Sequence, residues 1–548
     1  MKNKRILSNQ IKLFLLVAIA FAIVLYAMPA SGVTAVSSIA PQTNMNQPAP
    51  PSIVSAALPA NKTNNGLANC RYGVNALDTS QTLAQLEVIP DLGSGWYVTY
   101  EVTTPNPEPT NGAEFVRMIH VNQQKDANGN YLQAYTTRPP IDASFANYIT
   151  QFPGSTWIVG NEIERIGQGE IHADLYAEAY HNIYNFIKAN DPTALVAISA
   201  LVQYTPGRMQ YLDIMWQAYQ DKYGTSMPID IWTFHLYILP EVEQDGITPN
   251  NIANVALGTN PALGKRVSNG TPASCPNNDV YCFAEHDNMN IFTQQVMTLR
   301  QWMKTHGQQN KPLMLTEFSI LYPYIQDPGS CFLQDEYGNC FTPQRVKNYM
   351  LNTFDYLNTA QDPNVGYPLD NNRLVQEWAW YSIHAATVGQ ASNLYEEDIT
   401  TQTLAGTTMA NYVWSEPTYK DLIVESADST IVFTGNAATA TAELTTSFRN
   451  RGNIAVESPF KVTFYADANL TQPIGEVTIN ADLAGCAIRK MTASVNWSDL
   501  TPGVHPYWVF VDSSNTIPET PDSNTNNIKQ GWVYVDPNQI MLPIVFND

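Results

Sequence analysis

Residues 157–162 read Trp-Ile-Val-Gly-Asn-Glu, and residues 312–318 read Pro-Leu-Met-Leu-Thr-Glu-Phe. Each stretch is an apolar run that reaches a glutamate, Glu162 in the first and Glu317 in the second. A continuous apolar run of this length is typical of a strand buried on both faces, as in a parallel sheet. In α/β barrels the catalytic side chains lie at the carboxyl ends of such strands. The two stretches therefore predict a parallel barrel with two carboxylates at its mouth.

Strand-like segments recur along the chain and alternate with helical ones. The eight candidate strands are residues 72–76, 96–100, 115–121, 157–161, 194–202, 229–238, 313–318 and 377–383. Apolar residues spaced by three and four within 209–223 and 289–303 predict helices that pack on the sheet. The pattern over residues 70–416 therefore predicts the α/β class and a (β/α)8 TIM barrel.

The pattern changes after residue 416. Between residues 417 and 535, short alternating segments separated by turn clusters replace the helical spacing. Such a series is typical of an immunoglobulin-like β-sandwich. The tail 536–548 contains the apolar run 540–546, which could dock as an extra edge strand.

The N-terminal residues 1–35 are typical of a secretory signal peptide. A basic segment precedes the apolar run 13–28, and the small residues that follow offer a cleavage site. The run is shorter than the ~20 residues of a membrane span, and an uncleaved membrane anchor is the alternative. Residues 36–69 are rich in Pro, Ser, Asn and Thr, which predicts a disordered linker. We therefore expect a secreted or cell-surface protein.

Charge and motif content exclude other classes. The chain carries 49 acidic and 28 basic residues, a formal net charge of −21. Nucleic-acid binding needs a basic surface, so this balance disfavours it. Neither a CxxC pair nor an HExxH motif occurs, so we predict no metal site and no other cofactor.

Six cysteines are available for disulfides in an oxidising compartment. Two pairs are close in sequence and are predicted to form local bridges: Cys275 with Cys282, and Cys331 with Cys340. Cys70 and Cys486 are left over. A bond between these two would tie the start of the barrel to the sandwich, and the spacing leaves that pairing open.

Residues 70–416 resemble the clan A glycoside hydrolases, which are retaining enzymes on a (β/α)8 barrel. The resemblance rests on Asn161-Glu162 at the end of the fourth candidate strand and on Glu317 at the end of the seventh. It implies that Glu162 is the general acid/base, that Glu317 is the nucleophile, and that Asn161 contacts the sugar hydroxyl beside the reacting carbon. Five residues on other strands are implied to bind substrate: His120, His235, Tyr237, Trp378 and Trp380. We expect one of the two tryptophans to serve packing instead.

Residues 417–535 resemble the CARDB-type adhesion sandwich, chiefly in 511–519 and in Asn526-Asn527. The resemblance implies attachment to a cell surface or a glycan. The acidic run 512–522 lacks the spacing of an EF-hand, so turn chemistry is the preferred interpretation.

The sequence thus predicts an exported glycoside hydrolase that acts on an oligo- or polysaccharide by a retaining double displacement. One alternative is a catalytically inactive barrel that binds glycans, and another is an adhesion protein whose active part is the sandwich. Two structural expectations follow from the predicted layout. Arg165 should pair with Glu164 and leave Glu162 for catalysis, and the barrel should fold and work without residues from 417 onward.

Overall fold

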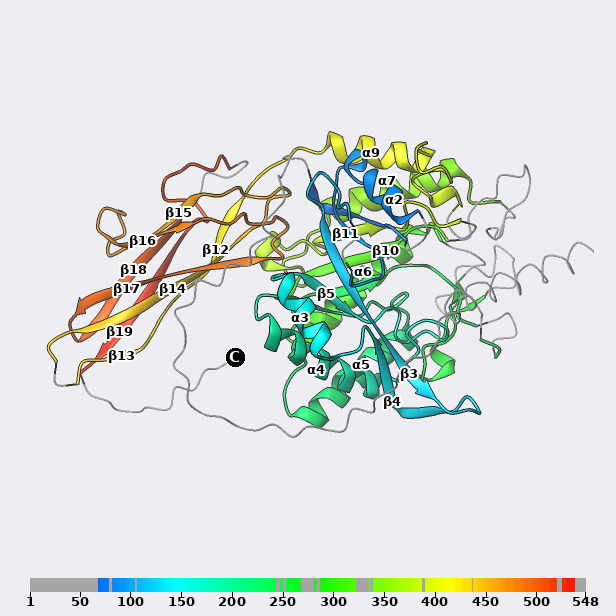
Figure 1. Ribbon diagram of the computed structural model, residues 1–548, viewed down its shortest axis with the longest axis horizontal. Coiled ribbons are helices and arrows are strands. Elements are labelled where there is room, and N and C mark those ends of the chain that lie inside the picture. The colour runs from blue at the N-terminus through cyan, green and yellow to red at the C-terminus, as the bar shows by residue number, and fades with distance from the viewer. Residues whose placement is uncertain are drawn as a thin grey trace, which may run out of the picture. The chain divides into compact units, whose positions relative to one another are not determined.

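The computed structural model of this protein (Figure 1) describes most of the barrel and sandwich regions. The described residues are 68–77, 81–103, 106–242, 247–249, 253–267, 280–281, 286–321, 335, 339–386, 390–435, 437–519 and 525–537. The predicted signal peptide, nearly all of the predicted linker and the apolar run 540–546 lie outside them. Within the described ranges, no helix is both long and apolar enough to span a membrane.

The predicted parallel barrel is confirmed. Its eight strands are β1 (Asn69–Asn75), β2 (Ser94–Val98), β3 (Glu114–Lys125), β5 (Thr156–Val159), β6 (Leu195–Ile198), β7 (Trp232–His235), β10 (Leu313–Phe318) and β11 (Glu377–Trp380). They pair in the order β6-β5-β3-β2-β1-β11-β10-β7. A parallel bridge between Ala197 and Ile231 joins the two ends of this order and closes the barrel.

Helices follow most of the strands, as the alternating pattern predicts (Figure 1). The α-helices are α2 (Thr82–Glu87), α3 (Ala143–Gln151), α4 (Ala173–Asn190), α5 (Pro206–Tyr223), α6 (Met289–Thr305), α7 (Pro343–Thr359) and α9 (Leu404–Ser415). Short elements complete this part: η1 (Pro90–Leu92), η2 (Pro261–Leu263), β8 (Arg266–Val267), β9 (Val280–Tyr281), η4 (Pro368–Asp370) and η5 (Gln390–Ser392). The apolar stripe of α6 packs into the core through Phe292, Val296, Leu299 and Met303, all buried.

The sequence pattern does not predict one feature at the barrel mouth. Strand β3 runs on past its barrel partners and pairs in antiparallel fashion with β4 (Tyr131–Arg138). The side chains of β4 are half-buried or exposed throughout, so the strand lacks the apolar alternation that marks a buried element.

The C-terminal part is a β-sandwich, as predicted. Its strands are β12 (Leu422–Ser429), β13 (Val432–Phe433), β14 (Ala440–Asn450), β15 (Phe460–Tyr465), β16 (Pro473–Ile479), β17 (Lys490–Leu500), β18 (Gly503–Val511) and β19 (Ile528–Asp536). One sheet has the order β12-β14-β17 and the other β13-β19-β18-β15-β16. The carboxylate of Asp512 accepts from the backbone nitrogens of Thr516 and Ile517, which is the turn chemistry expected for the acidic run.

The barrel interior is completed by the sandwich. Inward-facing apolar residues of the strands form one buried cluster: Trp96, Val98, Val116, Met118, Ile158, Ala197, Ile231, Met314 and Ala379. Cys486 and Ile488, from the sandwich segment before β17, belong to the same cluster. The expectation that the barrel core needs nothing from residue 417 onward is therefore wrong, because two sandwich side chains fill part of that core.

Polar contacts fix the same segment to the barrel. Arg489 donates to the carbonyl oxygen of Gly154 and to Thr156 Oγ1, and it forms an ion pair with Glu114 at the start of β3. From the barrel side, Arg71 pairs with Asp370 at 2.5 Å and also donates to the carbonyl oxygen of Arg451. Through these contacts the two buried arginines tie the barrel and the sandwich together.

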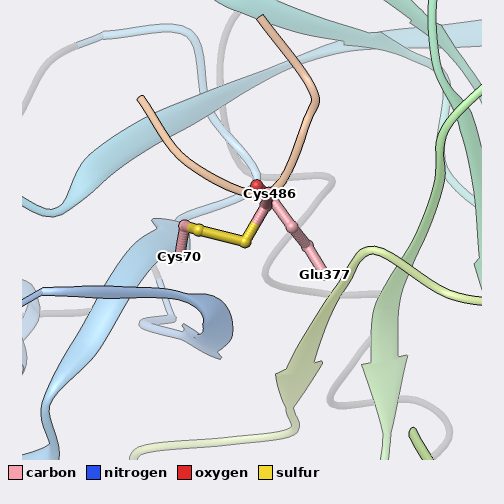
Figure 2. A group of neighbouring side chains, drawn as sticks. All are labelled: Cys70, Glu377 and Cys486. Carbon is pink, nitrogen blue, oxygen red and sulfur yellow. A yellow bond between two sulfur atoms is a disulfide. The ribbon is translucent and has the colours of Figure 1, made fainter. Parts of the chain in front are cut away.

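A disulfide between Cys70 and Cys486 adds a covalent tie, which settles the pairing that the spacing left open. Figure 2 shows the side chain of Glu377, at the start of β11, reaching toward this bond. Burial raises the pKa of Glu377 well above its usual range. Since both sulfur atoms are committed to the disulfide, the three residues do not form a metal site.

The two predicted local bridges are only partly visible. Cys275, Cys282 and Cys331 lie outside the described residues, whereas Cys340 is disulfide-bonded.

Candidate active site

Two glutamates and a histidine meet at the mouth of the barrel. Glu162 lies three residues after the end of β5, and Glu317 lies in β10. His235 ends the neighbouring strand β7, where it stands in register with Glu317. The carboxylate oxygens and the imidazole nitrogen all lie within 4.8 Å of one another. Each of the three residues is less than a tenth exposed. The strand ends thus bring together side chains that are up to 155 positions apart by number (317 − 162).

His235 bridges the two glutamates. Its Nδ1 lies 3.1 Å from Glu162 Oε1, and its Nε2 lies 3.4 Å from Glu317 Oε1. Burial works against the charged imidazole, but the facing carboxylates of Glu317 and Glu162 raise the pKa of His235 overall. The histidine therefore couples the protonation of one carboxyl to that of the other.

Two tyrosine hydroxyls contact the carboxylate of Glu317, one at each oxygen. The Tyr100 hydroxyl lies 2.5 Å from Oε1, and the Tyr237 hydroxyl donates to Oε2 at 3.0 Å. Tyr100 is also 2.7 Å from Asn75 Oδ1, and the Asn75 amide nitrogen donates to the carbonyl oxygen of Thr316. Donors on both carboxylate oxygens fix the orientation of Glu317 in the barrel mouth.

Arg165 contacts Glu162, not Glu164 as the sequence led us to expect. Its Nη1 lies 2.9 Å from Glu162 Oε2. A turn closed by the Arg165 backbone nitrogen and the Glu162 carbonyl oxygen at 3.0 Å places the two side chains on the same side. Glu164 pairs instead with the fully buried Arg208 at 2.8 Å, and Arg208 also pairs with Glu241. The prediction that Arg165 leaves Glu162 unpaired is therefore wrong.

In this arrangement the pKa values of the two glutamates move in opposite directions. Burial works against ionisation of Glu162, but the charge of Arg165 and the hydrogen bond from His235 outweigh it and lower its pKa to about 2. Burial raises the pKa of Glu317; His235 lowers it in part, and the negative charge of Glu162 adds to the rise. Unequal pKa values are what acid–base chemistry on two neighbouring carboxyls requires.

Three of the other predicted substrate-binding residues also reach this region. Tyr237 contacts Glu317 directly. Asn161 precedes Glu162, and its buried Oδ1 has no hydrogen-bond partner among the described residues, so it can still accept one. His120 lies farther back: its Nε2 is 2.6 Å from the carbonyl oxygen of Tyr100, and burial lowers its pKa to about 4. His120 thus supports the residue that holds Glu317.

Trp378 and Trp380 lie elsewhere, so the prediction that they stack on a sugar needs correction. They are 1% and 0% exposed and pack between the sheet and its helices. Trp378 meets Tyr72 edge to face, and Trp380 donates its indole nitrogen to the Ser392 carbonyl oxygen. Alternation does place both on one side of β11, but that side is the helix side.

Three residues of the site were missed by sequence reasoning: Asn75, Tyr100 and Tyr381. Tyr381 follows β11 by one residue, is half-buried, and lies with its ring centroid 6.4 Å from that of Tyr237. The same alternation that turns Trp380 outward turns Tyr381 toward the mouth. Position just after a strand end was the available signal for Tyr100 and Tyr381, since no motif surrounds either residue.

Comparison with known proteins gives matches for both parts. Residues 419–530 match the CARDB family model, and no curated protein matches the chain. Among solved structures, the chain is similar to a GH128 (subgroup I) endo-beta-1,3-glucanase from Amycolatopsis mediterranei in complex with laminaritriose. The two sequences are 14% identical, the match covers 62% of this chain and 99% of that one, and the TM-score is 0.37. It is also similar to a GH128 (subgroup II) endo-beta-1,3-glucanase from Sorangium cellulosum, at 15% identity, covering 64% and 99%, with a TM-score of 0.36. The CARDB domain of a Pyrococcus furiosus protein, solved with di-metal ions, matches at 23% identity, covering 23% and 100%, with a TM-score of 0.19.

Proposed function

We propose that this protein is an exported glycoside hydrolase that cleaves O-glycosidic bonds of an oligo- or polysaccharide with retention of configuration. The observation that carries the proposal is the pair of buried carboxyls, Glu162 and Glu317, with oxygens within 4.8 Å of each other across the barrel mouth. Retaining glycosidases place their carboxyl groups about 5–5.5 Å apart, whereas inverting ones keep about 6.5–9.5 Å to admit a water. The short separation favours the retaining class.

In the proposed reaction Glu317 attacks the anomeric carbon while Glu162 delivers a proton to the departing glycosidic oxygen. A glycosyl ester on Glu317 results. Glu162 then takes a proton from water, and the water oxygen displaces Glu317 from the anomeric carbon. The hydrogen bonds from Tyr100 and Tyr237 support this role for Glu317, because they aim an oriented carboxylate into the mouth.

The contact between Arg165 and Glu162 favours a second assignment in which the roles are exchanged. With its pKa at about 2, Glu162 is ionised at neutral pH, and an ionised carboxylate is what a nucleophile needs. The raised pKa of Glu317 would then suit the acid. Under the first assignment, Arg165 must release Glu162 before that carboxyl can carry a proton. Its side chain is 22% exposed, so a bound saccharide could displace it.

Replacing Arg165 by glutamine should decide between the two assignments. Loss of the cation raises the pKa of Glu162 toward its usual range. If Glu162 is the acid, it stays protonated to higher pH, and the basic limb of the kcat/KM profile on an unactivated oligosaccharide moves up. If Glu162 is the nucleophile, the acidic limb moves up instead. The Arg165→Lys variant keeps the charge and should leave both limbs near the parent positions. If neither limb of the profile moves in Arg165→Gln, Arg165 does not control the pKa of Glu162.

A hydrolysis screen tests the function itself. The full chain is incubated with aryl glycosides and with laminari- and cello-oligosaccharides, xylan and mannan, and released reducing ends are counted. We expect hydrolysis of at least one substrate by the parent and none by a Glu162→Gln, Glu317→Gln double variant. If the folded parent binds a glycan of this set and cleaves none, the inactive glycan-binding alternative is the better one.

A further inference from the structure

The exposed apolar side chains of the sandwich gather on one sheet. Among the described residues of this domain, the large hydrophobic side chains that are clearly exposed all lie on or next to β13, β18 and β19: Ile431, Phe433, Val504, Ile528, Trp532 and Tyr534. Trp532 and Tyr534 are 46% and 56% exposed. Their neighbours Val533 and Val535 point into the sandwich core. The alternation of β19 therefore presents its aromatic residues outward.

The strand register makes these residues into a continuous surface. Across the β18–β19 pair, the directly opposed outward residues are Val504 with Tyr534, Pro506 with Trp532, Trp508 with Gln530, and Phe510 with Ile528. Across the β15–β18 pair, Tyr465 stands opposite Trp508, and across the β13–β19 pair Phe433 stands opposite Asp536. Directly opposed side chains on a sheet lie within contact distance. We call the six aromatic residues of this surface the aromatic face: Phe433, Tyr465, Trp508, Phe510, Trp532 and Tyr534.

The composition and charge of the aromatic face indicate what binds there. Sugar rings have apolar faces that stack on flat aromatic side chains, whereas their hydroxyls need neutral polar partners such as the exposed Gln530. Lys461 on this surface pairs with Glu476 at 2.7 Å. With a net charge of −21 the chain as a whole repels anionic polymers. A neutral polysaccharide fits both properties.

We propose that the aromatic face is a second glycan-binding site, which holds a neutral polysaccharide chain outside the catalytic cleft. This proposal rests on the proposed function, because a glycoside hydrolase has a reason to meet a glycan. The disulfide between Cys70 and Cys486, together with the contacts of Arg489, fixes the sandwich to the barrel. The aromatic face is therefore tied to the same enzyme as the catalytic residues, and a long polysaccharide bound there has a raised effective concentration at that enzyme.

Retention on insoluble glycans tests the site. The full chain carries Glu317→Gln, which prevents degradation, and is mixed with insoluble β-glucan, microcrystalline cellulose or chitin. Short soluble oligosaccharides of the same sugar are added in excess to occupy the catalytic cleft. We expect retention on at least one solid. Removing two stacking rings with Trp532→Ala and Tyr534→Ala should weaken it about tenfold or more. Trp532→Tyr keeps a ring and should bind nearly as the parent does, and Asn496→Ala on the other sheet should have no effect.

Several results would overturn the proposal. These are absence of retention by the parent on every solid, and unchanged retention in the double variant. A third contradicting result is that the parent is a dimer and the double variant a monomer while retention is unchanged. The aromatic face would then be a contact between two copies of the protein. Melting curves by circular dichroism check that the variants fold. Hydrolysis of small soluble substrates by the same variants in the active background should stay at the parent rate. Failure of the proposed function would show as no hydrolysis by the parent, and retention on the solids is measured independently of it.

Discussion

Glu317→Ala should lower kcat/KM on every substrate of this protein on the order of 10⁴-fold or more, as loss of a catalytic nucleophile does in other hydrolases. The reason is the geometry around this carboxylate. Both of its oxygens are held by tyrosine hydroxyls, and Glu162 lies within 4.8 Å across the mouth. Alanine removes the acceptor of the Tyr237 hydroxyl and, under the proposed mechanism, the group that attacks the anomeric carbon. Initial rates on a soluble oligosaccharide, with circular dichroism to check folding, provide the measurement.

The companion variant should behave differently. Glu162→Ala should slow substrates with poor leaving groups far more than activated aryl glycosides, because only the poor leaving groups need the proton. Glu443→Ala, which removes an exposed carboxylate from strand β14 of the sandwich, serves as the control and should keep the parent rate. Turnover by folded Glu317→Ala at the parent rate would remove this residue from the mechanism.

A chain that ends at Trp414 should fail to form a stable barrel. Truncation removes Cys486 and Ile488 from the interior cluster and takes Arg489 from the backbone carbonyl of Gly154. Burial of one isoleucine side chain contributes about 1.5–3 kcal/mol, and the void it leaves adds to the loss. Domains of this kind are stable by only about 5–15 kcal/mol. We expect aggregation or a melting transition far below that of the full chain.

A point substitution separates the packing effect from the rest of the truncation. Ile488→Ala in the full chain should destabilise it by about 2–5 kcal/mol, as buried large-to-small changes do. Ile431→Ala, at a side chain that is 55% exposed, is the matched control and should change stability little. If the truncated barrel melted cooperatively near the parent temperature and kept its activity, the sandwich would contribute nothing to the barrel core.

Periodicity in the sequence was enough to predict the layout of both domains. Most of the barrel strands coincide with apolar runs, because a strand covered on both faces is largely apolar. The β3–β4 hairpin was missed for the opposite reason, since β4 is exposed and has no apolar pattern. The link between Ile488 and the barrel interior was also invisible, because a short segment far along the chain carries no sign of what it packs against.

The candidate site was predictable only in part. Glu162 and Glu317 stand out because each ends an apolar run. Alternation along the strand showed that Trp378 and Trp380 lie on the same side of the sheet. It did not show whether that side faces the barrel interior or the helices, and the structure buries both against the helices. The partner of Arg165 depended on the turn after β5, where the chain reverses so that this residue faces Glu162. Side-chain direction at strand ends was thus the main quantity that the sequence pattern could not provide.

The anomeric configuration of the first-formed product is the most direct measurement of the proposed mechanism. Hydrolysis of a substrate from the screen can be followed by proton NMR, with spectra recorded before mutarotation scrambles the anomers. Because one oxygen of Glu162 and one of Glu317 lie within 4.8 Å of each other, a separation that favours the retaining class, we predict that the first-formed product has the same anomeric configuration as the bond that is cleaved. An initial product of opposite configuration would contradict the covalent mechanism on Glu317.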